Sequence, residues 1–194
     1  VTVASTLLLQ DISSISASAE GAGSSGNAGQ VTVSASDLLL ENQSGISSQT
    51  GGSGNAGNVL INADRLETSG ISSISSIAAF GATGAAGNVG LNIVGEARIQ
   101  GEASVVATTD GPGDAGFVQI NADALTMQGG RVETSTAGAG NAGSVDINVT
   151  SADLDAFSNI SSSTNSAGDA GGVRINASGD VSLGNNSVIQ TNTT

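Results

Sequence analysis

The sequence predicts an all-β fold, a right-handed parallel β-helix (a solenoid) of about seven coils, with about 28 residues and three short strands per coil. Two observations predict it: a glycine-rich phrase recurs at a nearly constant interval, and apolar residues follow each copy at every second position. The phrase is GNAGQVTV, and it returns as GNAGNVLI, GAAGNVGL, GDAGFVQI, GNAGSVDI and GDAGGVRI. The copies begin at residues 26, 54, 84, 113, 140 and 168, so the periods are 28, 30, 29, 27 and 28.

The first strand of each coil follows the phrase directly. Its apolar residues alternate with other residues, as in a strand that buries one face. They are Val31/Val33, Val59/Ile61, Val89/Leu91, Val118/Ile120, Val145/Ile147 and Val173/Ile175. Val1 and Val3 fit the same register, so we expect the chain to begin inside a coil.

Two further apolar groups in each period predict a second and a third strand. The second group is Leu38/Leu40, Leu66, Ile99, Leu125/Met127, Leu154 and Val181/Leu183. The third group is Ile46, Ile71, Val105, Val132, Ile160 and Val188. Turns rich in Gly, Ser, Asn and Asp separate the groups, and no segment keeps a helical period over a useful length. A propeller blade needs ~40 residues and leucine-rich repeats need a leucine signature, so neither fits.

The repeat of one phrase and three apolar groups therefore extends over the whole chain. We expect residues 1–194 to form a single β-helical repeat domain, a segment of a longer solenoid, with units starting near residues 26, 54, 84, 113, 140 and 168.

The last glycine of the phrase marks a structural turn. A corner that needs a positive φ, or a close approach between backbones, excludes a Cβ and so selects glycine. In a solenoid the same corner recurs in every coil. The predicted turn glycines are Gly29, Gly57, Gly87, Gly116, Gly143 and Gly171.

An asparagine follows the first strand in most coils. Stacked amides one strand spacing apart can hydrogen-bond along the rod as a ladder. The predicted ladder is Asn62, Asn92, Asn121, Asn148 and Asn176, with Ala4 and Ser34 at this position in the first two coils. A row of ligand-binding amides is the alternative.

Acidic residues are the candidates for a metal site. Asp114 and Asp169 replace asparagine in the phrase, and a column of carboxylates could bind Ca²⁺, which prefers oxygen ligands. No EF-hand spacing accompanies them. Carboxylates that keep the turns soluble are the alternative.

Composition restricts function. The chain has 17 acidic residues against four arginines and a net charge of −13, which argues against nucleic acid and anionic membranes as partners. It has no Cys, His, Lys or Tyr to act as nucleophile or base, and only three Phe. We therefore expect no catalytic residues and no cofactor. A carbohydrate-active β-helix enzyme remains the weakest alternative.

The units GNAGNVLINADRLETSGISSIS and GDAGFVQINADALTMQGGRVETST resemble the repeats of filamentous haemagglutinin-like proteins, across essentially the whole chain. The resemblance implies a β-helix exported by two-partner secretion to the bacterial cell surface, where it acts as an adhesive or structural shaft. Partners would be neighbouring coils or copies of itself, and cell-surface glycans or other cells. A self-stacking extracellular fibre subunit is the alternative. The secretion domain typical of the family and an Arg-Gly-Asp tripeptide are both missing from these residues.

Overall fold

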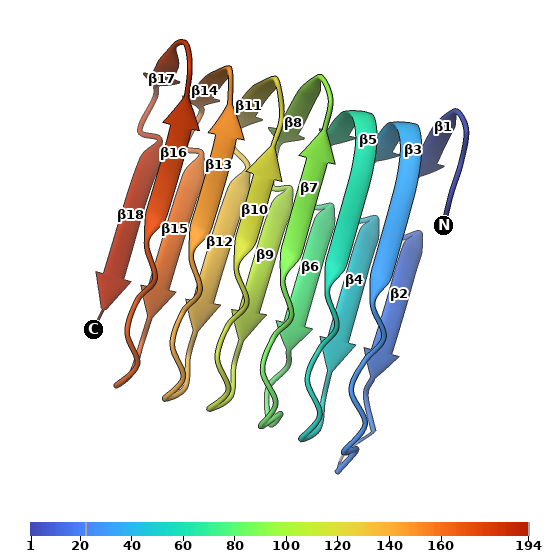
Figure 1. The fold of residues 1–194 in the computed structure, drawn as a ribbon, viewed down its shortest axis with the longest axis vertical. Helices are drawn as coiled ribbons and strands as arrows, with labels where there is room; N and C mark the ends of the chain where they lie inside the picture. Colours follow the sequence, from blue (N-terminus) through green and yellow to red (C-terminus); the bar gives the residue numbers. More distant parts are fainter. Residues whose placement is uncertain (22, 194) are drawn as a thin grey trace.

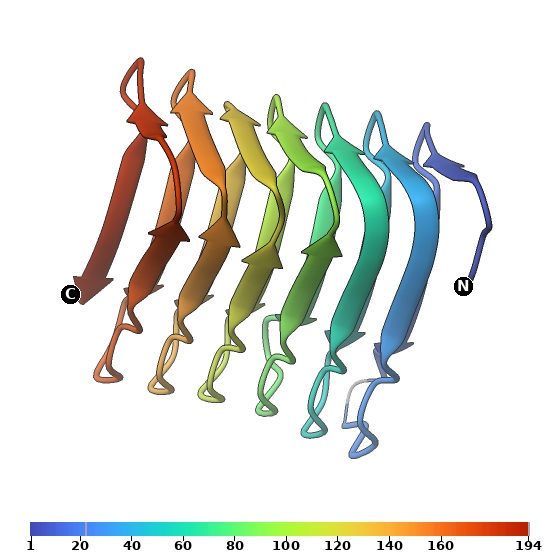
Figure 2. The same cartoon turned by 45° about the horizontal axis from the view of Figure 1, so that its top comes forward.

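Each complete coil of the chain has three strand segments, and in two coils the first and second segments join into one strand of 10 residues. Equivalent segments of successive coils lie side by side (Figures 1 and 2). The computed structural model describes residues 1–21 and 23–193. All strand pairs in its two sheets are parallel, and there are about seven coils. The predicted fold class is confirmed. No helix that could span a membrane occurs in the described part of the chain.

The strands form three faces. The first face contains the first halves of β3 (Val31–Leu40) and β5 (Val59–Thr68), then β7 (Val89–Ile93), β10 (Val118–Asn121), β13 (Val145–Val149) and β16 (Val173–Ala177). The second contains β1 (Thr6–Leu9), the second halves of β3 and β5, then β8 (Glu96–Gln100), β11 (Ala124–Gln128), β14 (Ser151–Asp155) and β17 (Val181–Leu183). The third contains β2 (Ser14–Ala19), β4 (Gly45–Thr50), β6 (Ser73–Ala78), β9 (Ser104–Thr109), β12 (Arg131–Thr136), β15 (Asn159–Thr164) and β18 (Val188–Thr193).

The core is a set of aliphatic columns that run through the coils. On the first face Val59 pairs with Val89 and Ile61 with Leu91, and all four side chains are almost wholly buried. On the second face Ile99 pairs with Met127, and Met127 with Leu154. Because each buried side chain touches its counterpart above and below, neighbouring coils supply the burial that one coil lacks.

Some residues expected in these columns lie elsewhere. On the third face Ile46 pairs with Ile74, whereas Ile71 is 58% exposed at the preceding corner. In the last coil Ile189 pairs with Ile160, and Val188 is 41% exposed. Both expectations were wrong because the corner before the third strand breaks the alternation, so counting by twos across it selects the wrong residue.

The first coil also departs from the expected register. Thr2 bridges to Ser34, so Val1 and Val3 do not align with Val31 and Val33, and Thr2 rather than Ala4 lies beside Ser34 in the asparagine position. The shift is two residues. Period-2 patterning cannot detect it, because a shift of two leaves every side chain on the same face.

The corner between the second and third strands has left-handed backbone in every coil. Residues with positive φ there are Asp11, Ile12, Asn42, Gln43, Gly70, Gly101, Gly129, Ala156, Phe157, Asn185 and Asn186. Asparagine and glycine tolerate this conformation, while bulky residues adopt it rarely. Two more glycines with positive φ, Gly23 and Gly81, follow the third strand of their coils, and no described residue of the glycine-rich phrase has a positive φ.

Candidate functional site: the stacked columns of the solenoid

The six predicted turn glycines stack in one column. None has a positive φ, and in the five copies after Gly29 the backbone of the preceding coil approaches too closely for a Cβ. A Cβ added to Gly57 would lie 2.3 Å from the carbonyl oxygen of Gly29, and one added to Gly116 would lie 2.0 Å from that of Gly87. The first glycine of the phrase is equally restricted, since a Cβ on Gly54 would lie 2.1 Å from the Gly26 oxygen. The corner is thus closed to side chains at two positions in every copy of the phrase after the first.

Buried serine hydroxyls on the third face join one glycine corner to the next in three coils, at Ser48, Ser76 and Ser162. Ser76 donates to the Gly57 oxygen at 2.9 Å and accepts from the Gly87 amide at 2.8 Å. Ser48 donates in the same way to the Gly29 oxygen at 3.0 Å and accepts from the Gly57 amide at 2.8 Å. The column is Ser48, Ser76, Ala107, Thr134 and Ser162.

Sequence reasoning missed this hydroxyl column, although a signal was present. Ser48 and Ser76 lie two residues after the buried Ile46 and Ile74, so strand alternation places them inward. A polar residue at an inward position needs a hydrogen-bond partner, and the backbone of the glycine corner supplies two.

The five predicted ladder asparagines also stack in one column, and after Asn62 each side-chain amide nitrogen donates to the amide oxygen of the preceding asparagine. Asn92 donates to Asn62 at 3.0 Å, and Asn121 donates to Asn92 at 2.9 Å. Asn148 then donates to Asn121 at 3.0 Å, and Asn176 to Asn148 at 2.8 Å. Because all four bonds point the same way, the amide dipoles add along the rod.

The two Ca²⁺ candidates occupy another column of side-chain to backbone bonds. Asp114 Oδ1 accepts a hydrogen bond from the backbone amide of Asn141 at 2.7 Å. The backbone amide of Asp169 donates in turn to Asn141 Oδ1 at 2.9 Å. In an earlier coil Asn27 Oδ1 accepts from the Asn55 amide in the same way. Asn141 separates the two aspartates, and no group of three potential metal ligands occurs among the described residues. Asp114 thus takes the structural part of an asparagine.

Three arginines form ion pairs with glutamates, two pairs on the second face and one on the third. Arg65 pairs with Glu67, Arg98 with Glu96 at 2.8 Å, and Arg131 on the third face pairs with Glu133 at 3.0 Å. Each pair joins residues two apart on one strand, which point to the same side.

The carboxyl of Glu96 has a shifted pKa. Burial alone would raise the pKa of its carboxyl, but a hydrogen bond from Thr126 at 2.8 Å and the Arg98 guanidinium outweigh burial. The pKa of Glu96 therefore lies below its ordinary value, and the carboxylate stays ionised to hold its partners.

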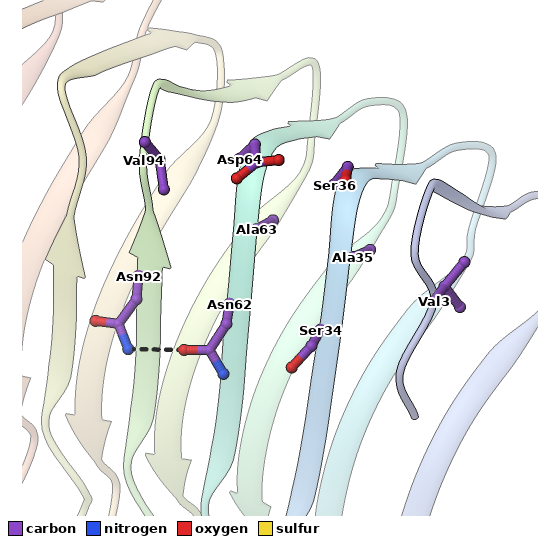
Figure 3. Close-up of a pocket in the computed structure, with 9 residues that line it drawn as sticks. All are labelled: Val3, Ser34, Ala35, Ser36, Asn62, Ala63, Asp64, Asn92 and Val94. Carbon is purple, nitrogen blue, oxygen red and sulfur yellow. Dashed lines mark hydrogen bonds between the residues drawn. The ribbon is translucent and has the colours of Figure 1, made fainter.

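A shallow groove of about 420 Å³ lies beside the first end of the asparagine ladder (Figure 3). Ser34 holds the ladder position of the preceding coil, so the ladder ends at Asn62. Val94, 76% exposed, adds an apolar surface. Of the described residues that line the groove, Asp64 alone is ionisable. Glycoside hydrolysis usually uses two carboxyl groups, and the described lining of this groove provides one.

Comparison of the chain with protein-family models, with curated proteins and with solved structures gives no match. The function is therefore inferred from the stacked glycine, hydroxyl and amide columns of the chain itself.

Proposed function

We propose that the chain is a non-catalytic structural and adhesive shaft of a secreted, cell-surface protein of the filamentous haemagglutinin type. The observation that carries the proposal is the stacking itself. Columns of glycines, hydroxyls and side-chain amides run through successive coils. The hydroxyls bond to the glycine backbone, the amides bond to one another, and both kinds of bond link neighbouring coils. These groups hold the rod together and are occupied in doing so.

This arrangement of coils is suited to a long shaft. Each coil interacts chiefly with its two neighbours, so coils can be added without changing the interactions of the others. The proposed partners are neighbouring coils, and glycans or cells that the exposed faces meet. The net charge of −13 disfavours nucleic acid and anionic lipid, and the absence of cysteine suits a chain that crosses a membrane unfolded and folds outside.

Adhesion of coated beads tests the proposal. Beads carrying the purified chain would be passed over a panel of bacterial and animal cells, against beads carrying an unrelated protein of similar charge. We expect greater retention of the solenoid beads on at least one cell type. Equal retention on every cell type would contradict the adhesive function.

A second assay addresses catalysis. The chain would be incubated with acidic and neutral polysaccharides, and new reducing ends and new unsaturated ends would be measured. We expect neither. Turnover that rises with protein concentration would assign the chain to the carbohydrate-active enzymes instead.

The self-stacking fibre subunit is the second candidate, because successive coils already join edge to edge through parallel strands in register. The same pairing could join one copy to the next. Unpaired edges accept further strands. Sedimentation velocity across a concentration series tests this: growing species indicate stacking, and a constant monomer contradicts it.

A further inference from the structure

The corner between β11 and β12 is one residue shorter than the same corner elsewhere. Residues 128–131 separate Met127 from Val132, whereas residues 100–104 separate Ile99 from Val105 in the preceding coil. Residues 155–159 form the equivalent corner in the following coil. This deletion falls in the period of 27, the shortest in the chain.

The short corner leaves a notch of about 370 Å³ in the edge of the rod. Its floor is the backbone of Gly129 and Gly130. A Cβ on Gly130 would lie 2.5 Å from Ile99 Cγ2, and one on Gly129 would lie 2.9 Å from the Gly101 oxygen, at a φ of +76°. Both positions are therefore restricted to glycine.

Phe157 forms one wall of the notch, on the coil that follows. Its φ is 66°, a conformation that bulky residues rarely adopt, and its side chain gains little burial because the residue is 71% exposed. The last coil has Asn185 and Asn186 at this corner, which tolerate the same backbone. Ile12 and Gln43 adopt the same backbone at this corner, so the φ belongs to the corner. What distinguishes Phe157 is an exposed aromatic ring beside a hollow, which points to a ligand.

Polar residues line the rest of the notch. Glu102 is exposed on the preceding coil, and Arg131 and Asn159 lie at the starts of β12 and β15. Arg131 bonds Glu133 through Nη1, and its side chain is 54% exposed, which leaves further N–H groups on the guanidinium for a ligand. The notch thus offers a carboxylate acceptor, guanidinium and amide donors, and an apolar face.

We propose that this notch binds a neutral pyranose sugar. The aliphatic C–H face of a pyranose suits the electron-rich face of Phe157, and its hydroxyls can donate to Glu102 and accept from Arg131 and Asn159. An anion would meet Glu102 and the net negative charge, and a cation would meet Arg131. The inference rests on the proposed adhesive function and names its ligand class.

NMR titration tests the site directly. Lactose, maltose, cellobiose and N,N′-diacetylchitobiose would be added separately at millimolar concentration to the labelled chain, with the acyclic polyol mannitol as the control. We expect at least one sugar to shift the amide signals of Gly129 and Gly130 and the ring signals of Phe157. No shift with any of the four sugars, or equal shifts with mannitol, would overturn the proposal.

Two variants and a matched control identify the residues responsible. Phe157→Ala should weaken the affinity for the responding sugar by about tenfold or more, and Glu102→Ala should also weaken it. Phe80→Ala is the control, because Phe80 is 90% exposed on another corner. Unchanged affinity in Phe157→Ala, or an equal loss in Phe80→Ala, contradicts the site. If Phe157→Ala abolishes sugar binding but the coated beads still adhere to cells, the notch binds sugar and the adhesive function of the shaft does not depend on it.

Discussion

The hydroxyl of Ser76 donates to the Gly57 carbonyl at 2.9 Å, and through this bond the third face of one coil is fastened to its own glycine corner. The Ser76 hydroxyl oxygen also accepts a hydrogen bond from the backbone amide of Gly87 in the next coil, at 2.8 Å. One buried atom therefore links two coils. Such a hydroxyl stabilises stacking more than an exposed serine can, because its loss leaves two backbone groups unpaired.

Ser76→Ala should lower the free energy of unfolding by about 1–3 kcal/mol, because the Gly57 oxygen and the Gly87 amide lose their partner. The midpoint of urea unfolding, followed by circular dichroism, measures the effect. Ser47→Ala is the matched control on the neighbouring strand, where the side chain points outward, and it should be nearly neutral. An equal loss in both variants would contradict the role of Ser76.

Ala107→Ser should have the opposite effect. Ala107 holds the position of the bridging hydroxyl in the next coil, where a serine would meet the Gly87 oxygen and the Gly116 amide. Because those backbone groups are already placed, we expect a gain of up to about 1 kcal/mol in the same unfolding assay. Destabilisation by this substitution would show that the fourth coil does not share the geometry of the third.

Gly116→Ala should destabilise the chain by about 3 kcal/mol, since its Cβ would lie 2.0 Å from the backbone oxygen of Gly87. Gly172→Ala is the control: an added Cβ there meets no atom within 4 Å, and the free energy should change by less than about 0.5 kcal/mol. Similar unfolding midpoints for the two variants would rule out close approach as the reason for the glycine column.

Asn121→Ala should cost about twice as much as Asn176→Ala. Asn121 lies within the ladder and takes part in two side-chain bonds, whereas Asn176 at its end takes part in one. Each bond should contribute about 0.5–1 kcal/mol. Urea unfolding of the two variants gives the ratio, and equal losses would indicate that the amides act independently of their neighbours.

Glu96 should make stability depend on pH. Its pKa is lowered in the folded chain, so its contribution is present above its ordinary pKa and is lost as the pH falls through the lowered value. Glu96→Gln removes the titration. The stability difference between the parent chain and this variant should be largest near neutral pH and should fall in acid. A constant difference across that range would contradict the assignment.

Much of this architecture was predictable from the sequence, and the exceptions have one physical origin. Val59 and Ile61 were placed correctly because alternation along a strand fixes their face. Ile71 was misplaced because a left-handed corner intervenes, and alternation does not continue across it. The notch beside Gly129 needed the structure, since a deletion of one residue has no meaning until the flanking strands are aligned.

Disulfide formation between designed cysteines tests the in-register stacking most directly, because the chain has no cysteine of its own. Ser135 pairs with Ser163 on neighbouring coils, and Glu133 lies two residues out of register with Ser163. Stacked positions about 4.8 Å apart suit a disulfide, while the offset pair exceeds the reach of about 7 Å. We predict that the Ser135→Cys, Ser163→Cys pair oxidises readily under mild conditions and the Glu133→Cys, Ser163→Cys pair does not. Equal oxidation of the two pairs, or preference for the offset pair, would contradict the solenoid register on which every column depends.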